Sequence, residues 1–141
     1  MAGVKIIVPK DLGPKPIPPG VYKVRFTGHK VKQTGPDSKV PGTTMLSMEY
    51  QILTQGPDDS VKTIGRKLWD NCTLAPEALW KLDQVTKAFA GLPLPEGEYT
   101  EEELIARLIA ILTNKEALAI VTNETYQGRT QDRVKEFKPA A

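Results

Sequence analysis

Basic side chains in separated segments of this chain are its best candidates for chemistry. An ammonium or guanidinium group binds phosphate oxygens, and a series of such groups can follow the backbone of a nucleic acid. Affinity of this kind falls as salt rises, because phosphate contacts release counterions. The candidate phosphate-binding residues are Lys23, Arg25, Lys30, Lys32, Lys39, Arg66, Lys67, Arg129, Arg133 and Lys135.

Two aromatic residues beside these cations could stack on bases, a contact that contributes ~1–3 kcal/mol per base. Trp69 closely follows Lys67, and Tyr126 lies near the C-terminal cations. In a strand, Trp69 and Leu68 must point to opposite faces, and the sequence leaves open which of them faces the core. Tyr126 is equally open between stacking and packing. Aromatic residues make up only 6% of the chain, which limits the number of stacking positions.

Charge is unevenly distributed, although the net charge is only +2. Residues 1–42 contain eight Lys or Arg and two Asp, whereas residues 96–103 contain five Glu and no base. The basic part is either an ordinary solvated surface or one shaped for an anion. The acidic run suits the first turn of a helix, where the helix dipole favours carboxylates, or it recruits a partner.

Other chemistry has little support in the sequence. The single cysteine, Cys72, excludes an intramolecular disulfide, and the single histidine, His29, disfavours a metal site or a serine-type triad. We interpret Cys72 as a buried apolar residue and His29 as a strand-surface residue, and we expect no cofactor or metal. No nucleophile motif or Gly-rich phosphate loop is present. The protein is therefore expected to bind rather than to catalyse.

A nuclease is the remaining enzymatic alternative. Glu49, Asp58, Asp59 and Asp70 are the only carboxylates near expected strand ends. Their spacing does not pair them as a two-metal site.

The first regular element spans residues 21–32 and has a period of two, which is typical of a strand with one buried face. The expected apolar face holds Tyr22, Val24, Phe26 and Gly28. The opposite face holds Lys23, Arg25, Thr27 and His29. Further strands are expected over 46–52, 61–71, 117–125 and 133–138, with Gly65 as a bend.

Two helices are expected between the third and fourth strands. The first begins near Pro76 and ends at Gly91, which suits a C-terminal cap. Its apolar stripe comprises Leu79, Leu82, Val85, Ala88 and Phe89. The second begins at Thr100, with Glu103 completing a capping box.

The resulting order, β-β-β-α-α-β-β, is that of the oligonucleotide-binding (OB) fold, an all-β, five-stranded barrel with a helical insertion between strands three and four. In that fold the helix covers one end of the barrel. Ligands cross strands two and three and meet the loops that are here expected at residues 33–42 and 126–132. An α+β sheet with both helices on one side is the alternative that strand order leaves open.

Three stretches of sequence carry a resemblance to a known family: residues 20–26 (GVYKVRF), 65–82 (GRKLWDNCTL, then ALWKL) and 126–137 (YQGR, then RVKEF). Together they resemble a family of bacteriophage proteins that are encoded near replication and recombination genes and have long been filed as of unknown function. Its members are regarded as OB-fold single-stranded DNA-binding proteins, and the resemblance covers residues 18–139. It implies a non-catalytic, sequence-tolerant protein that supports phage DNA replication or recombination, with proteins of those processes as partners.

The domain organisation is expected to be simple: a Pro-rich arm (1–19), one OB-fold domain (20–138) and a short tail (139–141). No signal peptide or membrane helix is evident, so we expect a cytoplasmic protein, in the bacterial host if it is of phage origin. The apolar segment 4–8 leaves a homo-oligomer open. An OB-fold adaptor that binds proteins and not nucleic acid is the alternative function, because a fold does not determine a function.

Overall fold

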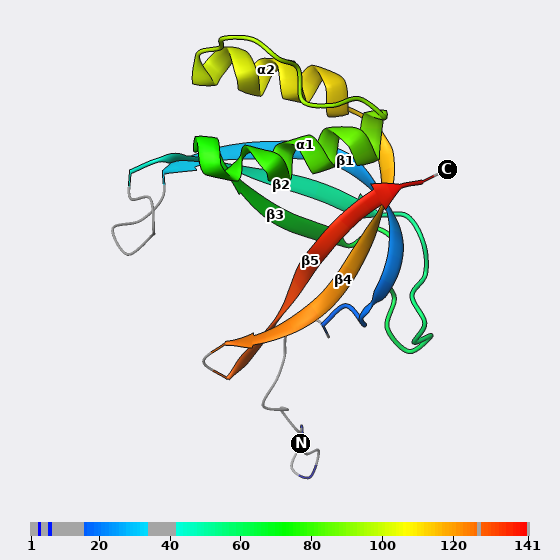
Figure 1. Ribbon diagram of the computed structural model, residues 1–141. Coiled ribbons are helices and arrows are strands. Elements are labelled where there is room, and N and C mark those ends of the chain that lie inside the picture. Colours follow the sequence, from blue (N-terminus) through cyan, green and yellow to red (C-terminus); the bar gives the residue numbers. More distant parts are fainter. Residues whose placement is uncertain (1–2, 4–5, 7–15, 34–41, 127, 141) are drawn as a thin grey trace.

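The computed structural model (Figure 1) describes residues 3, 6, 16–33, 42–126 and 128–140, with only the backbone of residues 126 and 129. Its strands are β1 (Gly20–Gln33), β2 (Thr44–Ile52), β3 (Lys67–Thr73), β4 (Glu116–Tyr126) and β5 (Arg129–Pro139). Between β3 and β4 stand a 3-10 turn, η1 (Pro76–Ala78), and two helices, α1 (Leu79–Ala90) and α2 (Glu101–Leu112). The predicted order of strands and helices is confirmed.

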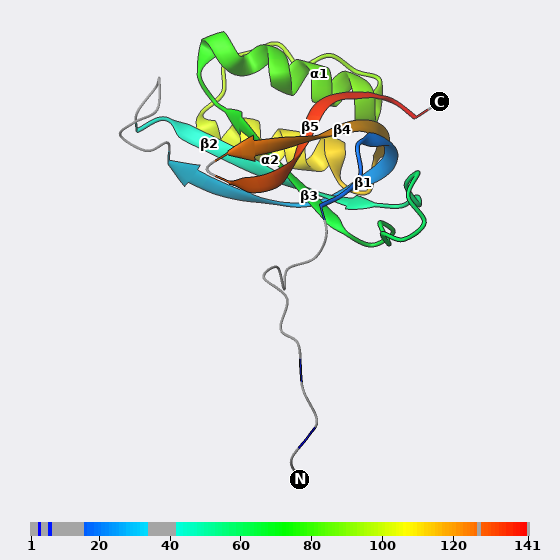
Figure 2. The same ribbon diagram turned by 90° about the horizontal axis from the view of Figure 1, so that it is seen from below.

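The strands form one antiparallel sheet in the order β3-β2-β1-β4-β5, with β1 at its centre. Seen from below (Figure 2), β4 and β5 fold back over the other strands, so the sheet is curled. β5 approaches β3, but the two remain unpaired edges of the sheet. The mostly β architecture with a helical insertion is confirmed, whereas the described strands do not close into a barrel.

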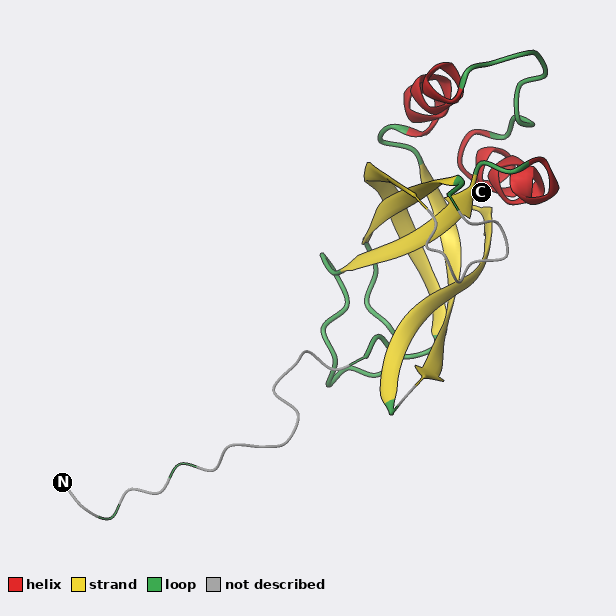
Figure 3. Cartoon of the chain, turned by 90° about the vertical axis from the view of Figure 1, so that its left-hand side faces the viewer, coloured by secondary structure: helices red, strands yellow, loops and turns green. Residues whose placement is uncertain are grey.

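Both helices lie on the same side of the sheet (Figures 1 and 3), and their ends follow the predicted signals. Gly91 caps α1 in the left-handed conformation, with φ 69°. Thr100 caps α2 by accepting a hydrogen bond from the backbone N–H of Glu103 at 3.2 Å. None of the helices in the described parts of the chain is long and apolar enough to cross a membrane.

The core fills the space between the inner face of the sheet and the helices. Four rings from β1, β2, α1 and β5 meet at its centre: Phe26, Tyr50, Phe89 and Phe137. Tyr50 is fully buried and stacks on Phe89, with 5.3 Å between ring centroids. The predictions that Phe26, Tyr50, Phe89, Tyr22 and Cys72 are core residues are confirmed.

β1 contains a β-bulge between Phe26 and Gly28, where its register against β2 shifts by one residue. Because a bulge inserts one extra residue, the alternation of side chains reverses beyond it. His29 therefore lies on the core side of the sheet, and its predicted place on the basic face is wrong. The same shift keeps Lys30 on the outward side together with Arg25.

Two expected boundaries are also wrong. The third strand begins at Lys67 rather than at residue 61, because residues 61–66 are irregular and the chain turns at Gly65, which adopts φ 88°. The last strand begins at Arg129 rather than at residue 133, so the expected loop 126–132 is a tight hairpin. Gly128 makes that turn with φ 76°.

The chain enters the folded part at Ile17, whose side chain is 1% exposed. The Ile17 N–H donates to Asp132 Oδ1 at 2.8 Å, and its carbonyl accepts from Asn123 Nδ2 at 2.9 Å. Most of the expected arm, the apolar segment 4–8 apart from Ile6, and most of the loop 33–42 lie outside the described residues.

Candidate nucleic-acid interface

The side of the sheet that faces away from the core carries several of the predicted site residues. We call it the outer face and define it by Lys23, Arg25 and Lys30 of β1, Glu49 of β2, and Lys67 and Trp69 of β3. Strand register places them together: Arg25 pairs with Gln51, which pairs with Lys67, and Glu49 pairs with Trp69. Directly paired residues of antiparallel strands project to the same side.

Trp69 lies on the outer face and not in the core. Its side chain is 42% exposed, whereas Leu68 is 3% exposed, which resolves the alternative that the sequence left open. The ammonium group of Lys30 lies over the indole, with its Nζ 5.2 Å from the ring centroid. This distance is typical of a cation–π interaction, so the outer face presents an exposed ring and a cation side by side.

Glu49 of β2 is a carboxylate on the outer face that binds the cation Lys67. Its Oε1 accepts hydrogen bonds from Lys67 Nζ at 2.8 Å and from Thr27 Oγ1 at 2.9 Å. The bond from Lys67, and then that from Thr27, lower the pKa of the Glu49 carboxyl. The carboxylate is therefore charged at neutral pH and held in one orientation.

A second carboxylate, Glu116 at the start of β4, pairs with both cations at the far end of the outer face. Arg25 Nη2 lies 2.8 Å from its Oε2, and Lys23 Nζ lies 3.2 Å from its Oε1. Hydrogen bonds from Arg25, and then from Lys23, lower the pKa of Glu116. A phosphate that binds Lys23 or Arg25 must compete with this carboxylate.

Arg66 and Arg133 are not part of the outer face, although Arg133 and Trp69 line one cleft. Arg66 forms an ion pair with Asp132, with Nη2 3.9 Å from Oδ2. Arg133 Nη1 lies 2.6 Å from Glu124 Oε2, and this hydrogen bond raises the pKa of the Arg133 guanidinium. The two arginines belong to the side of the molecule where β3 faces the β4–β5 hairpin.

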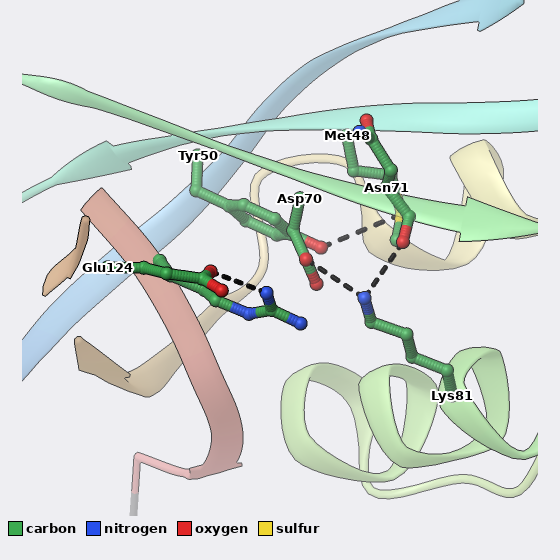
Figure 4. Close-up of polar contacts among 7 residues, drawn as sticks. Met48, Tyr50, Asp70, Asn71, Lys81 and Glu124 are labelled. Carbon is green, nitrogen blue, oxygen red and sulfur yellow. Dashed lines mark hydrogen bonds and ion pairs between the residues drawn. The ribbon is translucent and has the colours of Figure 1, made fainter. Parts of the chain in front are cut away.

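A polar cleft of about 250 Å³ lies between β3 and that hairpin. Trp69 forms part of its lining, so the cleft adjoins the outer face. Figure 4 shows Lys81 of α1 reaching toward Asp70 and Asn71, with Glu124 nearby. Lys81 Nζ lies 2.9 Å from Asp70 Oδ1 and donates to the Asn71 carbonyl at 2.8 Å. Lys81 was not among the predicted site residues.

The remaining predicted site residues differ in their placement. Lys32 lies two residues beyond Lys30 on β1 and on the same side of the sheet. Lys32 and Lys135 are exposed, and neither forms an ion pair with another described residue. Lys39 lies outside the described residues. The backbones of Tyr126 and Arg129 pair at the tip of the β4–β5 hairpin, but their side chains lie outside the described part of the structure.

The carboxylates are the main feature that the sequence-based prediction missed. The period of two in β2 indicated that Glu49 points outward, but nothing in its own strand indicated Lys67 and Thr27 as its partners. Glu116 and Glu124 lie 91 and 9 residues along the chain from the arginines that they bind. Only pairing between strands brings these charges together.

The carboxylates that were candidates for a nuclease active site do not lie together. Glu49 lies on the outer face. Asp70 pairs with the residue before Glu49, so it lies on the inner side of the sheet, where it forms an ion pair with Lys81. Among the described residues, no three His, Cys, Asp or Glu side chains are grouped so as to hold a metal ion.

Comparison with known proteins identifies a family. No curated protein matches this chain. A family model described as "Protein of unknown function (DUF669)" matches residues 10–141, which is nearly the whole chain. The protein therefore belongs to this family of proteins of unknown function.

Proposed function

We propose that the protein binds single-stranded DNA without strong sequence preference and without catalysis. The observation that carries the proposal is the position of Trp69: an exposed ring on a sheet face, with Lys30 over it and Lys67 on the same strand. Stacking rings beside cations are the elements that sequence-tolerant binders of single strands combine.

A single strand would cross β1, β2 and β3 on the outer face. One base would stack on the Trp69 indole and displace the Lys30 ammonium, which would then meet a neighbouring phosphate. The polar cleft beside Trp69 extends the path toward the β4–β5 hairpin.

The order of the strands supports this assignment. β3-β2-β1-β4-β5 is the order obtained when a five-stranded OB barrel is opened between its third and fifth strands. In OB folds the ligand crosses strands two and three, which is where Trp69 and Glu49 lie. The resemblance to phage proteins suggests that the DNA is presented during phage replication or recombination.

One observation favours the alternative of a protein-binding adaptor. Glu116 and Glu49 form ion pairs with three of the cations on the outer face, Lys23, Arg25 and Lys67. A face on which most of the cations are already paired, beside an exposed tryptophan, also suits a protein partner. Binding to a protein partner with no affinity for DNA would select the adaptor.

The test is fluorescence anisotropy with a labelled single-stranded oligonucleotide of mixed sequence, titrated at several salt concentrations, with the matching duplex as competitor. We expect binding at low salt. The logarithm of the association constant should fall linearly with the logarithm of the salt concentration, with a slope of about 0.7 for each phosphate contacted. Duplex DNA should compete weakly, because its bases are not free to stack.

Lys30→Ala should weaken binding, whereas Lys87→Ala should not, because Lys87 lies on α1 and pairs with Asp83. Absence of binding at low salt would overturn the proposal.

A further inference from the structure

Glu49 and Trp69 are direct cross-strand partners on the outer face. We infer that Glu49 makes the Trp69 position prefer bases that carry an exocyclic amino group, namely cytosine, adenine and guanine, over uracil and thymine. This inference rests on the proposed function, since it assigns a preference to the same site.

The geometry puts the carboxylate within reach of a stacked base. Directly paired side chains in an antiparallel sheet have Cβ atoms about 5 Å apart, and a base is wider than the ring on which it stacks. The edge of a base on Trp69 that points toward β2 therefore meets Glu49.

One oxygen of that carboxylate is available. Oε1 is engaged by Lys67 and Thr27, but Oε2 forms no hydrogen bond with another described residue. Oε2 is also at least partly exposed to solvent, because no side-chain oxygen in the described structure is both buried and unpartnered. Oε2 is thus an unpartnered acceptor on a side chain that is 16% exposed and that Lys67 and Thr27 hold in place.

The chemistry of an ionised carboxylate then discriminates between bases. It only accepts hydrogen bonds, so it favours the amino group of cytosine N4, adenine N6 or guanine N2. Uracil and thymine present a carbonyl oxygen at the position of the cytosine amino group, and two acceptors facing each other repel. The lowered pKa of Glu49 means that protonation does not relieve this repulsion at neutral pH.

The test compares oligo(dC) with oligo(dU) of equal length by anisotropy at mildly alkaline pH and fixed salt. The two bases differ only by the exchange of an amino group for a carbonyl and the accompanying ring proton. We expect oligo(dC) to bind roughly tenfold more tightly to the native protein, from the lower part of the range for a specific base contact.

In Glu49→Gln the ratio should fall toward one, because a glutamine amide both donates and accepts. Glu116→Gln is the matched control, since Glu116 also neutralises outer-face cations but pairs with Lys23 and Arg25 rather than facing Trp69. It should change both affinities by the same factor and leave the ratio intact.

The outcomes separate this inference from the proposed function. Equal, salt-sensitive binding of both oligonucleotides by the native protein overturns the inference and leaves DNA binding standing. A preference that persists in Glu49→Gln also overturns it. Failure of both oligonucleotides to bind at low salt overturns the proposed function. The comparison in the native protein holds even if the variant folds poorly.

Discussion

The ammonium nitrogen of Lys30 lies 5.2 Å from the centre of the Trp69 ring, although β2 separates the strands to which they belong. The contact depends on the bulge in β1, because unbroken alternation would turn Lys30 toward the side of Phe26. A local irregularity of the backbone therefore creates the most distinctive contact of the outer face.

Replacing Trp69 by alanine should weaken binding of single-stranded DNA roughly tenfold or more, since a stacked base contributes ~1–3 kcal/mol. Trp80 is the other tryptophan of the chain, and it is also exposed but lies on α1. Tryptophan fluorescence during titration with an oligonucleotide measures which of the two residues contacts DNA. Trp80→Phe, which retains only Trp69, should be quenched by DNA. Quenching of Trp69→Phe instead would place the DNA on the helical side.

Glu116→Gln should raise the affinity for single-stranded DNA and steepen its dependence on salt. The substitution releases Lys23 and Arg25 from their shared carboxylate. Two further phosphate contacts would increase the slope of the logarithmic salt plot by about 1.4. Isothermal binding titrations at four or more salt concentrations measure this slope. An unchanged slope would show that Lys23 and Arg25 do not contact DNA.

The ion pairs of Glu116 also predict how the stability of the protein changes in acid. The pKa of Glu116 is lower in the folded protein than in the unfolded chain, so its contribution to stability is present above the unfolded value, about 4.3, and is lost as pH falls through the folded one. The difference in urea midpoint between the native protein and Glu116→Gln should therefore be constant from neutral pH to about pH 5 and shrink in stronger acid. A difference that grows on acidification contradicts the ion pair.

Phe89→Ala should lower the free energy of unfolding by about 3–5 kcal/mol, because its ring fills the centre of the aromatic cluster and leaves a cavity. Tyr50→Phe is the matched change. It removes only a hydroxyl that donates to Met48 Sδ at 3.6 Å, and should cost less than about 1 kcal/mol. Urea unfolding followed by circular dichroism measures both. Similar losses for the two variants would contradict the central position of Phe89 in the aromatic cluster.

Cys72 should resist thiol reagents in the native protein. Its side chain is 1% exposed, and burial raises its pKa to about 12. At pH 8 only about one thiol in ten thousand would be ionised, against roughly a quarter for a free cysteine. Reaction with a disulfide reagent should be complete in denaturant and very slow without it. Fast native labelling would show that β3 opens locally.

The sequence by itself determined the elements that depend on local chemistry. Alternating apolar residues predicted β1 and β2, and an apolar, β-branched run predicted β4. The cap residues Gly91 and Thr100 marked helix ends that the structure confirms. These signals are local, because a strand's period and a helix cap involve residues only a few positions apart. The order of elements followed from them, and so did the polarity of the outer face.

Tertiary structure alone decided how the site is assembled. The bulge in β1, the outward position of Trp69 and the ion pairs of Glu49 and Glu116 all depend on which strands lie side by side and in which register. A shift of one residue in register turns every following side chain to the other face. Because the partners of these charges lie far apart in the sequence or on different strands, the sequence predicted the cations. Only the folded structure showed that carboxylates already pair with five of the eight whose side chains it describes.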